Sequence, residues 1–283
     1  MPHTEIEMRI DPLDPWRDVL VAELSELGYE AFEEITGGLK AYVRSDRFDR
    51  QALRRLIAFR DPHVHVSYSV REVPDTNWNA LWESGFEPVR VGSDVLIRAA
   101  HHPHEQGFRH ELVITPRMAF GTGHHATTRL MVRAMLDLDL RGSTVCDLGC
   151  GTGVLAILAI RLGAAHVRAI DIDPLAVENA RDNVRLDHCE GIVVEKGDVD
   201  LIGPGSCDAI LANIERNTLL RDMARMARAL RPAGRLLMSG FLVDDIGLMR
   251  AGAEDVGLHY VTELCEGGWA LLGLRSEPTP PNV

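Results

Sequence analysis

The stretch VCDLGCGTGVLAILAIRLGAAHVRAIDID, residues 145–173, decides the fold. It begins with a short apolar run over 145–148, which is typical of a strand buried on both faces of a parallel sheet. Glycines follow at spacings of two, and an apolar segment over 154–162 leads to a second strand over 167–170. This order predicts a βαβ unit of the kind that binds an adenine-bearing cofactor. We therefore expect an α/β domain with a doubly wound, Rossmann-like sheet.

The glycine turn and the acid that follows it are candidate cofactor contacts. Gly149, Gly151 and Gly153 permit positive φ and let the backbone approach a ligand without a Cβ in the way. The helix that follows leaves backbone N–H groups unpaired at its start, and these attract an anion such as a carboxylate. Asp171 ends the second strand, where its carboxylate can accept hydrogen bonds from both hydroxyls of a ribose.

The chemistry of this turn favours S-adenosylmethionine over a dinucleotide. A dinucleotide fingerprint needs G-x-G-x-x-G, but Val154 stands where its third glycine would be. Asp147 also places a negative charge beside the turn, which would repel a pyrophosphate and tolerate a cation. S-adenosylmethionine carries a ribose, a carboxylate, an ammonium and a sulfonium, so it suits both the acids and the N–H groups. The alternative is a glycine turn that binds no ligand.

The composition is that of an ordinary globular protein, with 46% hydrophobic and 25% charged residues. A chain of 283 residues suggests about two domains. The net charge of −12 and the 5% of aromatic residues argue against general nucleic-acid binding, and the charge suits a basic protein partner. No apolar run reaches the length of a membrane span, and the start of the chain lacks the features of a signal peptide.

The cysteines argue for a reducing compartment. They are odd in number, scattered, and without a C-x-x-C pair, which argues against a disulfide framework or a zinc site. We expect a cytoplasmic protein, and we take it to be a monomer. The five positions are Cys146, Cys150, Cys189, Cys207 and Cys265.

Residues 1–73 form a separate small domain in this interpretation. Alternating runs predict strands over 3–10, 31–35, 39–43 and 64–70, and helices over 16–27 and 49–59 lie between them. The order β-α-β-β-α-β is that of a ferredoxin-like module, which carries no chemistry by itself. We expect a linker helix over 74–86, a cofactor domain over 87–275 and a disordered tail over 276–283.

The stretch PRMAFGTGHHATTRLMVRAM, residues 116–135, carries a glycine-hinged loop just before the cofactor domain's central unit. Such a loop could fold over the cofactor, which makes Phe120, Gly121 and Thr122 candidate contacts, or it could be a plain connector. Thr127 or Thr128 is expected to begin the helix that runs through Leu136.

Three further features leave alternatives open. The histidines at 101, 102, 104 and 110 could bind a metal, but their spacing favours a solvated loop. Asp198, after the strand over 192–195, could meet the amine of an adenine or be a surface acid. Asn213 ends the strand over 208–212 and could either accept an N–H from a substrate amine or only end the strand.

Three segments together resemble one family. FGTGHHATT, DLGCGTG with IDIDP, and LANI followed by MSGF are similar to the bacterial lysine methyltransferases that modify large-subunit ribosomal protein L-eleven (L11). The glycine and acid motifs alone indicate a class I S-adenosylmethionine-dependent methyltransferase with a seven-stranded sheet. The FGTGxHxTT loop is much more specific, and the resemblance covers the whole length.

The resemblance implies a protein methyltransferase that uses S-adenosylmethionine to modify lysine and N-terminal amines of L11. It implies that the small N-terminal domain recognises L11, and that Thr128, Gly149, Asp171 and Asn213 contact the cofactor, with Asn213 near the methyl group. The sequence departs from the family after Asn213, where Glu215-Arg216-Asn217 replaces small apolar residues. Other interpretations are a methyltransferase for another protein or a small amine, and a non-catalytic cofactor-binding scaffold.

Overall fold

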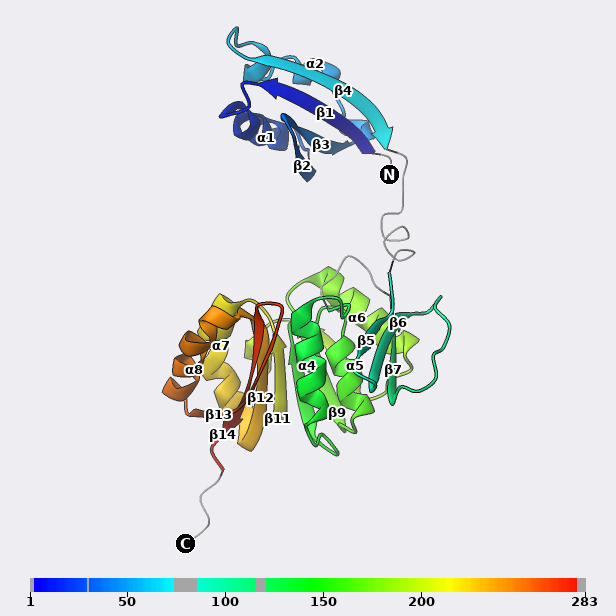
Figure 1. Ribbon diagram of the computed structural model, residues 1–283, viewed down its shortest axis with the longest axis vertical. Coiled ribbons are helices and arrows are strands. Elements are labelled where there is room, and N and C mark those ends of the chain that lie inside the picture. Colours follow the sequence, from blue (N-terminus) through cyan, green and yellow to red (C-terminus); the bar gives the residue numbers. More distant parts are fainter. Residues whose placement is uncertain (1–2, 30, 74–85, 116–120, 279–283) are drawn as a thin grey trace. The chain divides into compact units, whose positions relative to one another are not determined.

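The computed structural model describes residues 3–29, 31–73, 86–115 and 121–278. The chain divides into two compact units, residues 1–81 and 82–283, which are drawn in Figure 1. Residues 74–85 of the expected linker helix lie outside the described residues, and so do Phe120 and the last five residues of the expected tail.

The first unit has the predicted β-α-β-β-α-β order and one four-stranded antiparallel sheet, with strand order β2-β3-β1-β4. Side chains of the first helix, Leu20 and Leu24, are buried with Ile6 and Met8 of the first strand. The elements are β1 (His3–Asp11), α1 (Trp16–Glu26), β2 (Ala31–Ile35), β3 (Gly38–Arg44), α2 (Arg50–Leu53) and β4 (His65–Val73), with short 3-10 turns at Ser45–Arg47 and Ile57–Phe59.

The expected helix over 49–59 is wrong in its length. It is broken into α2 and the 3-10 turn Ile57–Phe59. The backbone N–H of Ile57 donates to the Glu23 carboxylate, with N···O distances of 3.0 and 3.1 Å. Because this N–H is bound to a side chain of α1, it does not need the carbonyl that a continuous helix would supply.

The second unit is built on a seven-stranded sheet with strand order β10-β9-β8-β11-β12-β14-β13. The predicted doubly wound, Rossmann-like sheet is confirmed, and within it only β14 runs antiparallel to its neighbours. The strands are β8 (Thr144–Leu148), β9 (His166–Asp171), β10 (Ile192–Lys196), β11 (Cys207–Asn213), β12 (Leu230–Leu242), β13 (Leu258–Glu266) and β14 (Trp269–Ser276).

Helices cover both faces of this sheet, as Figure 1 shows. Alternate residues of β8 and β11 belong to two different buried clusters, one on each face of the sheet. Val145 and Ala209 belong to the first cluster, and Cys146 and Ile210 belong to the second. The first cluster includes α4 (Ala126–Leu136), α5 (Val154–Arg161) and α6 (Pro174–Leu186); the second includes α7 (Arg216–Ala229) and α8 (Ile246–Asp255).

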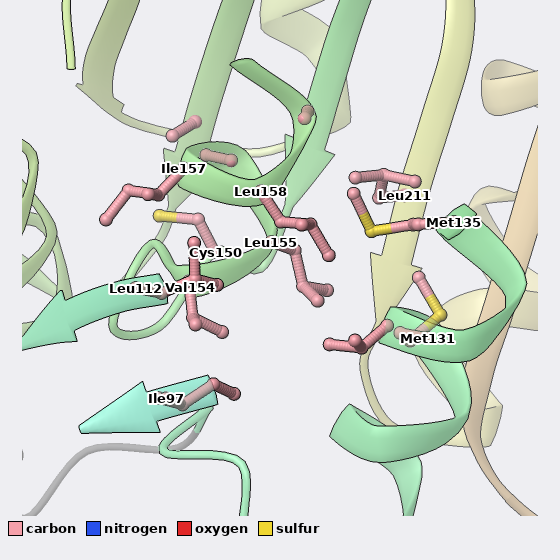
Figure 2. Close-up of a cluster of buried hydrophobic side chains, with 14 of the residues drawn as sticks. Ile97, Leu112, Met131, Met135, Cys150, Val154, Leu155, Ile157, Leu158 and Leu211 are labelled. Carbon is pink, nitrogen blue, oxygen red and sulfur yellow. The ribbon is translucent and has the colours of Figure 1, made fainter. Parts of the chain in front are cut away.

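A three-stranded sheet, β5 (Val89–Val91), β6 (Val95–Ala99) and β7 (His110–Ile114), packs against the first cluster. Figure 2 shows Ile97 and Leu112 of this sheet, with Met131 and Met135 of α4, around the side chains of α5. Because α5 is enclosed in this way, its residues 154–159 are all buried, as its uniformly apolar sequence predicts.

Asn183 of α6 and Asp187, which follows the end of this helix, hold the edge of β7. The Asn183 amide oxygen accepts from the Thr115 N–H at 2.7 Å, and the buried Asp187 carboxylate accepts from the Val113 N–H at 3.0 Å. The other Asp187 oxygen accepts from Arg161 at 2.9 Å. These contacts satisfy alternate N–H groups that a neighbouring strand would otherwise bind.

We predict that Asp187→Ala lowers the free energy of unfolding by about 3 kcal/mol, because it leaves the Val113 N–H without its acceptor and the Arg161 guanidinium without its carboxylate partner. Urea unfolding measures the loss. The control is Arg185→Ala in the last turn of α6, which removes an exposed guanidinium and its i,i+3 pair with Asp182 and should cost about 0.5 kcal/mol. Equal losses in the two variants would contradict the role assigned to Asp187.

None of the helices in the described part of the chain is long and apolar enough to cross a membrane.

Candidate functional site

The glycine turn lies at the carboxyl ends of the central strands. The chain passes from β8 to β9 on one side and returns to β11 on the other, so the order of strands reverses at β8. Crevices at such switch points are the usual ligand sites of open α/β sheets. Gly149, Gly151 and Gly153 all have positive φ, at 72°, 53° and 77°. A left-handed conformation at three alternate positions requires glycine, which explains the spacing.

Asp147 lies beneath this turn and is 1% exposed. Its Oδ2 accepts from the Ala156 N–H in the first turn of α5 at 3.0 Å, while its buried Oδ1 has no hydrogen-bond partner. Burial, together with the nearby charge of Asp171, raises the pKa of Asp147 to about 7. The sequence predicts a negative charge beside the turn. The structure instead places a buried acid there, with one acceptor oxygen that has no partner.

Asp171 is tied to the same turn. Its Oδ2 accepts from the Gly151 N–H at 2.9 Å and its Oδ1 from the Asp173 N–H at 3.0 Å. Each oxygen keeps a second lone pair, so the carboxylate can still accept from the two hydroxyls of a diol. The structure thus brings Asp147, Gly151 and Asp171 together.

Asn213 stands at the other side of the switch point. Ala212 of β11 pairs with Leu148 of β8, so Asn213 and Gly149 directly follow paired residues of adjacent strands. A Cβ on Gly149 would lie 2.1 Å from Cγ2 of Ile214, so only glycine fits there. Asn213 is 7% exposed, and its Oδ1 is buried without a hydrogen-bond partner.

The described part of the loop, residues 121–125, packs on the turn. Thr152 Oγ1 donates to the Gly121 carbonyl at 2.7 Å. The expectation that Thr127 or Thr128 begins the next helix is wrong by one or two residues, because α4 begins at Ala126 and His125 caps it. Nδ1 of His125 accepts from the Thr127 N–H. The Thr128 hydroxyl is buried without a hydrogen-bond partner, so it remains a candidate contact.

The remaining predicted residues are less connected to the turn. Asp198 is exposed, and its carboxylate accepts from the Asp200 N–H in the short turn that follows. Thr122 Oγ1 lies 3.4 Å from Nδ1 of His124. Phe120 lies outside the described residues. Within those residues, no group of three His, Cys, Asp or Glu side chains could hold a metal ion, and His104 of the histidine-rich stretch pairs with Glu111 instead.

The side chains that support the site are not marked by any motif in the sequence. Thr152, inside the glycine turn, could have been suspected as a polar residue beside candidate contacts. Asn183 donates to the Thr152 carbonyl at 2.9 Å, and Arg129 binds Glu266, 137 positions later. No local pattern indicates such long-range pairs.

Comparisons with known proteins agree on one family. The family model described as "Ribosomal protein L11 methyltransferase (PrmA)" matches residues 18–277. A protein of that name from Porphyromonas gingivalis is 43% identical over 267 residues, covering 93% of this chain and 91% of its own. Another from Phocaeicola vulgatus is 41% identical over 256 residues, covering 89% and 91%.

Among solved structures, the ribosomal protein L11 methylase from Lactobacillus delbrueckii subsp. bulgaricus aligns with a TM-score of 0.63. It covers 68% of this chain and 98% of its own, at 23% identity, which shows a shared fold.

The His125 cap predicts a pH-dependent stability. Burial and the charge of Arg129 lower the pKa of His125, and only the neutral ring can accept from the Thr127 N–H. The folded state therefore favours the neutral ring, and this stabilisation is lost as the pH falls below the unfolded pKa of about 6.5.

We predict that His125→Asn, which keeps a capping acceptor that does not titrate, loses less stability on acidification. Between about pH 8 and pH 5 the wild type should lose about 1 kcal/mol more than the variant, as measured by urea unfolding at both pH values. Identical pH dependence in the two proteins would rule out the cap as a titrating contact.

Proposed function

Since the chain belongs to the ribosomal protein L11 methyltransferase family, we propose that it transfers methyl groups from S-adenosylmethionine to amino groups of ribosomal protein L11. The observation that carries this proposal is the family match over residues 18–277, which includes nearly all of both units. The amino groups we propose are lysine side chains and the N-terminal amine. We assign recognition of L11 to the N-terminal unit and place the enzyme in the cytoplasm.

The residues at the switch point fit S-adenosylmethionine. Three buried oxygens there or on the adjoining α4 have no hydrogen-bond partner: Asp147 Oδ1, Asn213 Oδ1 and Thr128 Oγ1. Unpaired buried acceptors are costly, so a ligand that donates to them is favoured. We propose that Asp171 binds the ribose hydroxyls, that Asp147 faces the ammonium group, and that Gly149 and Gly151 lie against the nucleoside.

When bound, S-adenosylmethionine supplies an electrophilic methyl group on a sulfonium. In our mechanism, Asn213 Oδ1 accepts an N–H of the substrate amine and orients its lone pair for in-line attack. The amine must be neutral, which costs about 4–5 kcal/mol for an unperturbed lysine at pH 7. An amide at position 213 avoids the full negative charge that would stabilise the unreactive ammonium form.

The test of the activity uses purified L11, the enzyme and S-adenosylmethionine, with intact-mass analysis of L11. We expect mass increments of one methylene for each transferred methyl group. An L11 that stays unmodified while another protein or a small amine is methylated would contradict the substrate. A folded enzyme that binds the cofactor and methylates nothing would indicate the scaffold.

For Asn213 we predict that both Asn213→Ala and Asn213→Asp bind S-adenosylhomocysteine within about two-fold of the wild type but lose about 10²-fold or more in single-turnover rate. Calorimetry and rapid-quench kinetics measure the two quantities. Asn217→Ala is the matched control, because Asn217 is exposed and lies four residues further on, in α7. Near-normal single-turnover rates in both Asn213 variants would remove this residue from the mechanism.

The raised pKa of Asp147 predicts that cofactor affinity depends on pH. With a pKa of about 7, the acid is mostly neutral at pH 6 and mostly ionised at pH 8, and a cationic ligand binds the ionised form better. The affinity for S-adenosylhomocysteine, which keeps the ammonium, should therefore rise roughly ten-fold over this range. Asp147→Asn should flatten the dependence. A flat profile in the wild type would contradict the contact.

A further inference from the structure

We propose that Arg129 is a positioning residue for cofactor binding, because it fixes residues 121–125 on the glycine turn, and that Glu266 holds Arg129 in place. This inference rests on the proposed function. It concerns neither the turn itself nor Asn213. It depends on one guanidinium that joins two distant parts of the second unit.

Arg129 lies in α4 and uses two edges of its guanidinium. One edge binds the Glu266 carboxylate, with Nε–Oε1 and Nη2–Oε1 distances of 2.6 and 2.5 Å. The other edge, through Nη1, donates to the backbone carbonyls of Gly123, at 3.3 Å, and His124. A planar fork of donors can bind a carboxylate and a carbonyl pair at once, whereas the point charge of a lysine cannot.

The segment held by Arg129 is also held at its other end by the glycine turn. The Gly121 carbonyl accepts from Thr152 Oγ1 at 2.7 Å. Gly121 and Gly123 have φ of 97° and 94°, so this backbone is in a conformation that other residues rarely adopt. It makes no regular secondary structure, so side chains must supply the hydrogen bonds that fix it.

Glu266 connects α4 to the β13–β14 hairpin. It lies at the end of β13 and accepts from both Arg129 and Arg133, the latter at 2.5 Å. The next strand contributes Trp269, whose ring lies edge-on to His125 with centroids 4.6 Å apart. The β13–β14 hairpin thus contacts both α4 and the residue that caps it. Since Thr128 adjoins Arg129 in the first turn of α4, the same contacts set the position of its unpartnered hydroxyl.

Arg133 provides a matched control. It lies one turn further along α4 and binds the same carboxylate of Glu266, whereas the carbonyls of Gly123 and His124 accept from Arg129. Arg129→Lys and Arg133→Lys therefore make the same chemical change on the same helix beside the same acid. Only the first removes the fork that holds Gly123 and His124.

The experiment measures the dissociation constant of S-adenosylhomocysteine by calorimetry. We expect Arg129→Lys to weaken binding about ten-fold and Arg133→Lys to weaken it less than two-fold. Steady-state kinetics should show a raised KM for S-adenosylmethionine in Arg129→Lys, with kcat and the KM for L11 unchanged. Amide hydrogen exchange in peptides covering residues 121–128 should be faster in Arg129→Lys than in Arg133→Lys.

Three results would overturn the inference: unchanged affinity in Arg129→Lys, equal losses in both lysine variants, or a loss of kcat without a change in KM for the cofactor. If Arg129→Lys does not fold, Glu266→Gln decides in its place, because it keeps the side-chain shape and removes the charge that orients Arg129. Its affinity must then also fall. A wild type that binds no S-adenosylhomocysteine would instead contradict the proposed function.

Discussion

The buried carboxylate of Asp147 is the constraint on which the rest of the second unit depends. It joins the end of β8 to the first turn of α5 through the Ala156 N–H, and so fixes where the glycine turn begins and ends. Its second oxygen is left without a partner, at a pKa near neutrality. A buried acid of this kind lowers the stability of the folded chain as the pH rises from about 4 to about 7, because the unfolded chain ionises more easily. Stability and affinity for a cation are therefore opposed at this one residue.

The fold was largely predictable because its signals are local. Apolar runs identify β8, α5 and β9. Asp173-Pro174 is a sequence typical of a helix start, and α6 begins there, with the Asp173 carboxylate accepting from the Leu175 N–H. Predictions failed where a distant side chain replaced a local hydrogen bond. Glu23 binds the Ile57 N–H and ends the expected helix early, and His125 caps α4 in place of a threonine. Helix propensity does not predict either contact, since each depends on how the chain packs.

The site divides in the same way. Gly149, Gly151 and Asp171 could be proposed from the sequence because they are close together along the chain and their chemistry is distinctive. The pairings between the residues that support them could not be proposed from the sequence. Thr152 and Gly121 are 31 residues apart, Asn183 and Thr115 are 68 apart, and Arg129 and Glu266 are 137 apart. The residue types in these pairs are common, so their presence in the sequence does not indicate which residue each one contacts. Only the folded structure shows that they meet.

These supports bear on cofactor binding, because the groups that we expect to contact the cofactor must keep their positions relative to the glycine turn. The residues that we expect around the cofactor come from the ends of β8, β9 and β11 and from the start of α4. The sheet hydrogen bonds fix the three strand ends relative to one another, but α4 does not share that ladder. The position of α4 relative to the glycine turn must therefore be set by side chains, among them Thr152, Arg129 and Glu266. A substitution in the β13–β14 hairpin should therefore act on the same geometry as one in the turn itself.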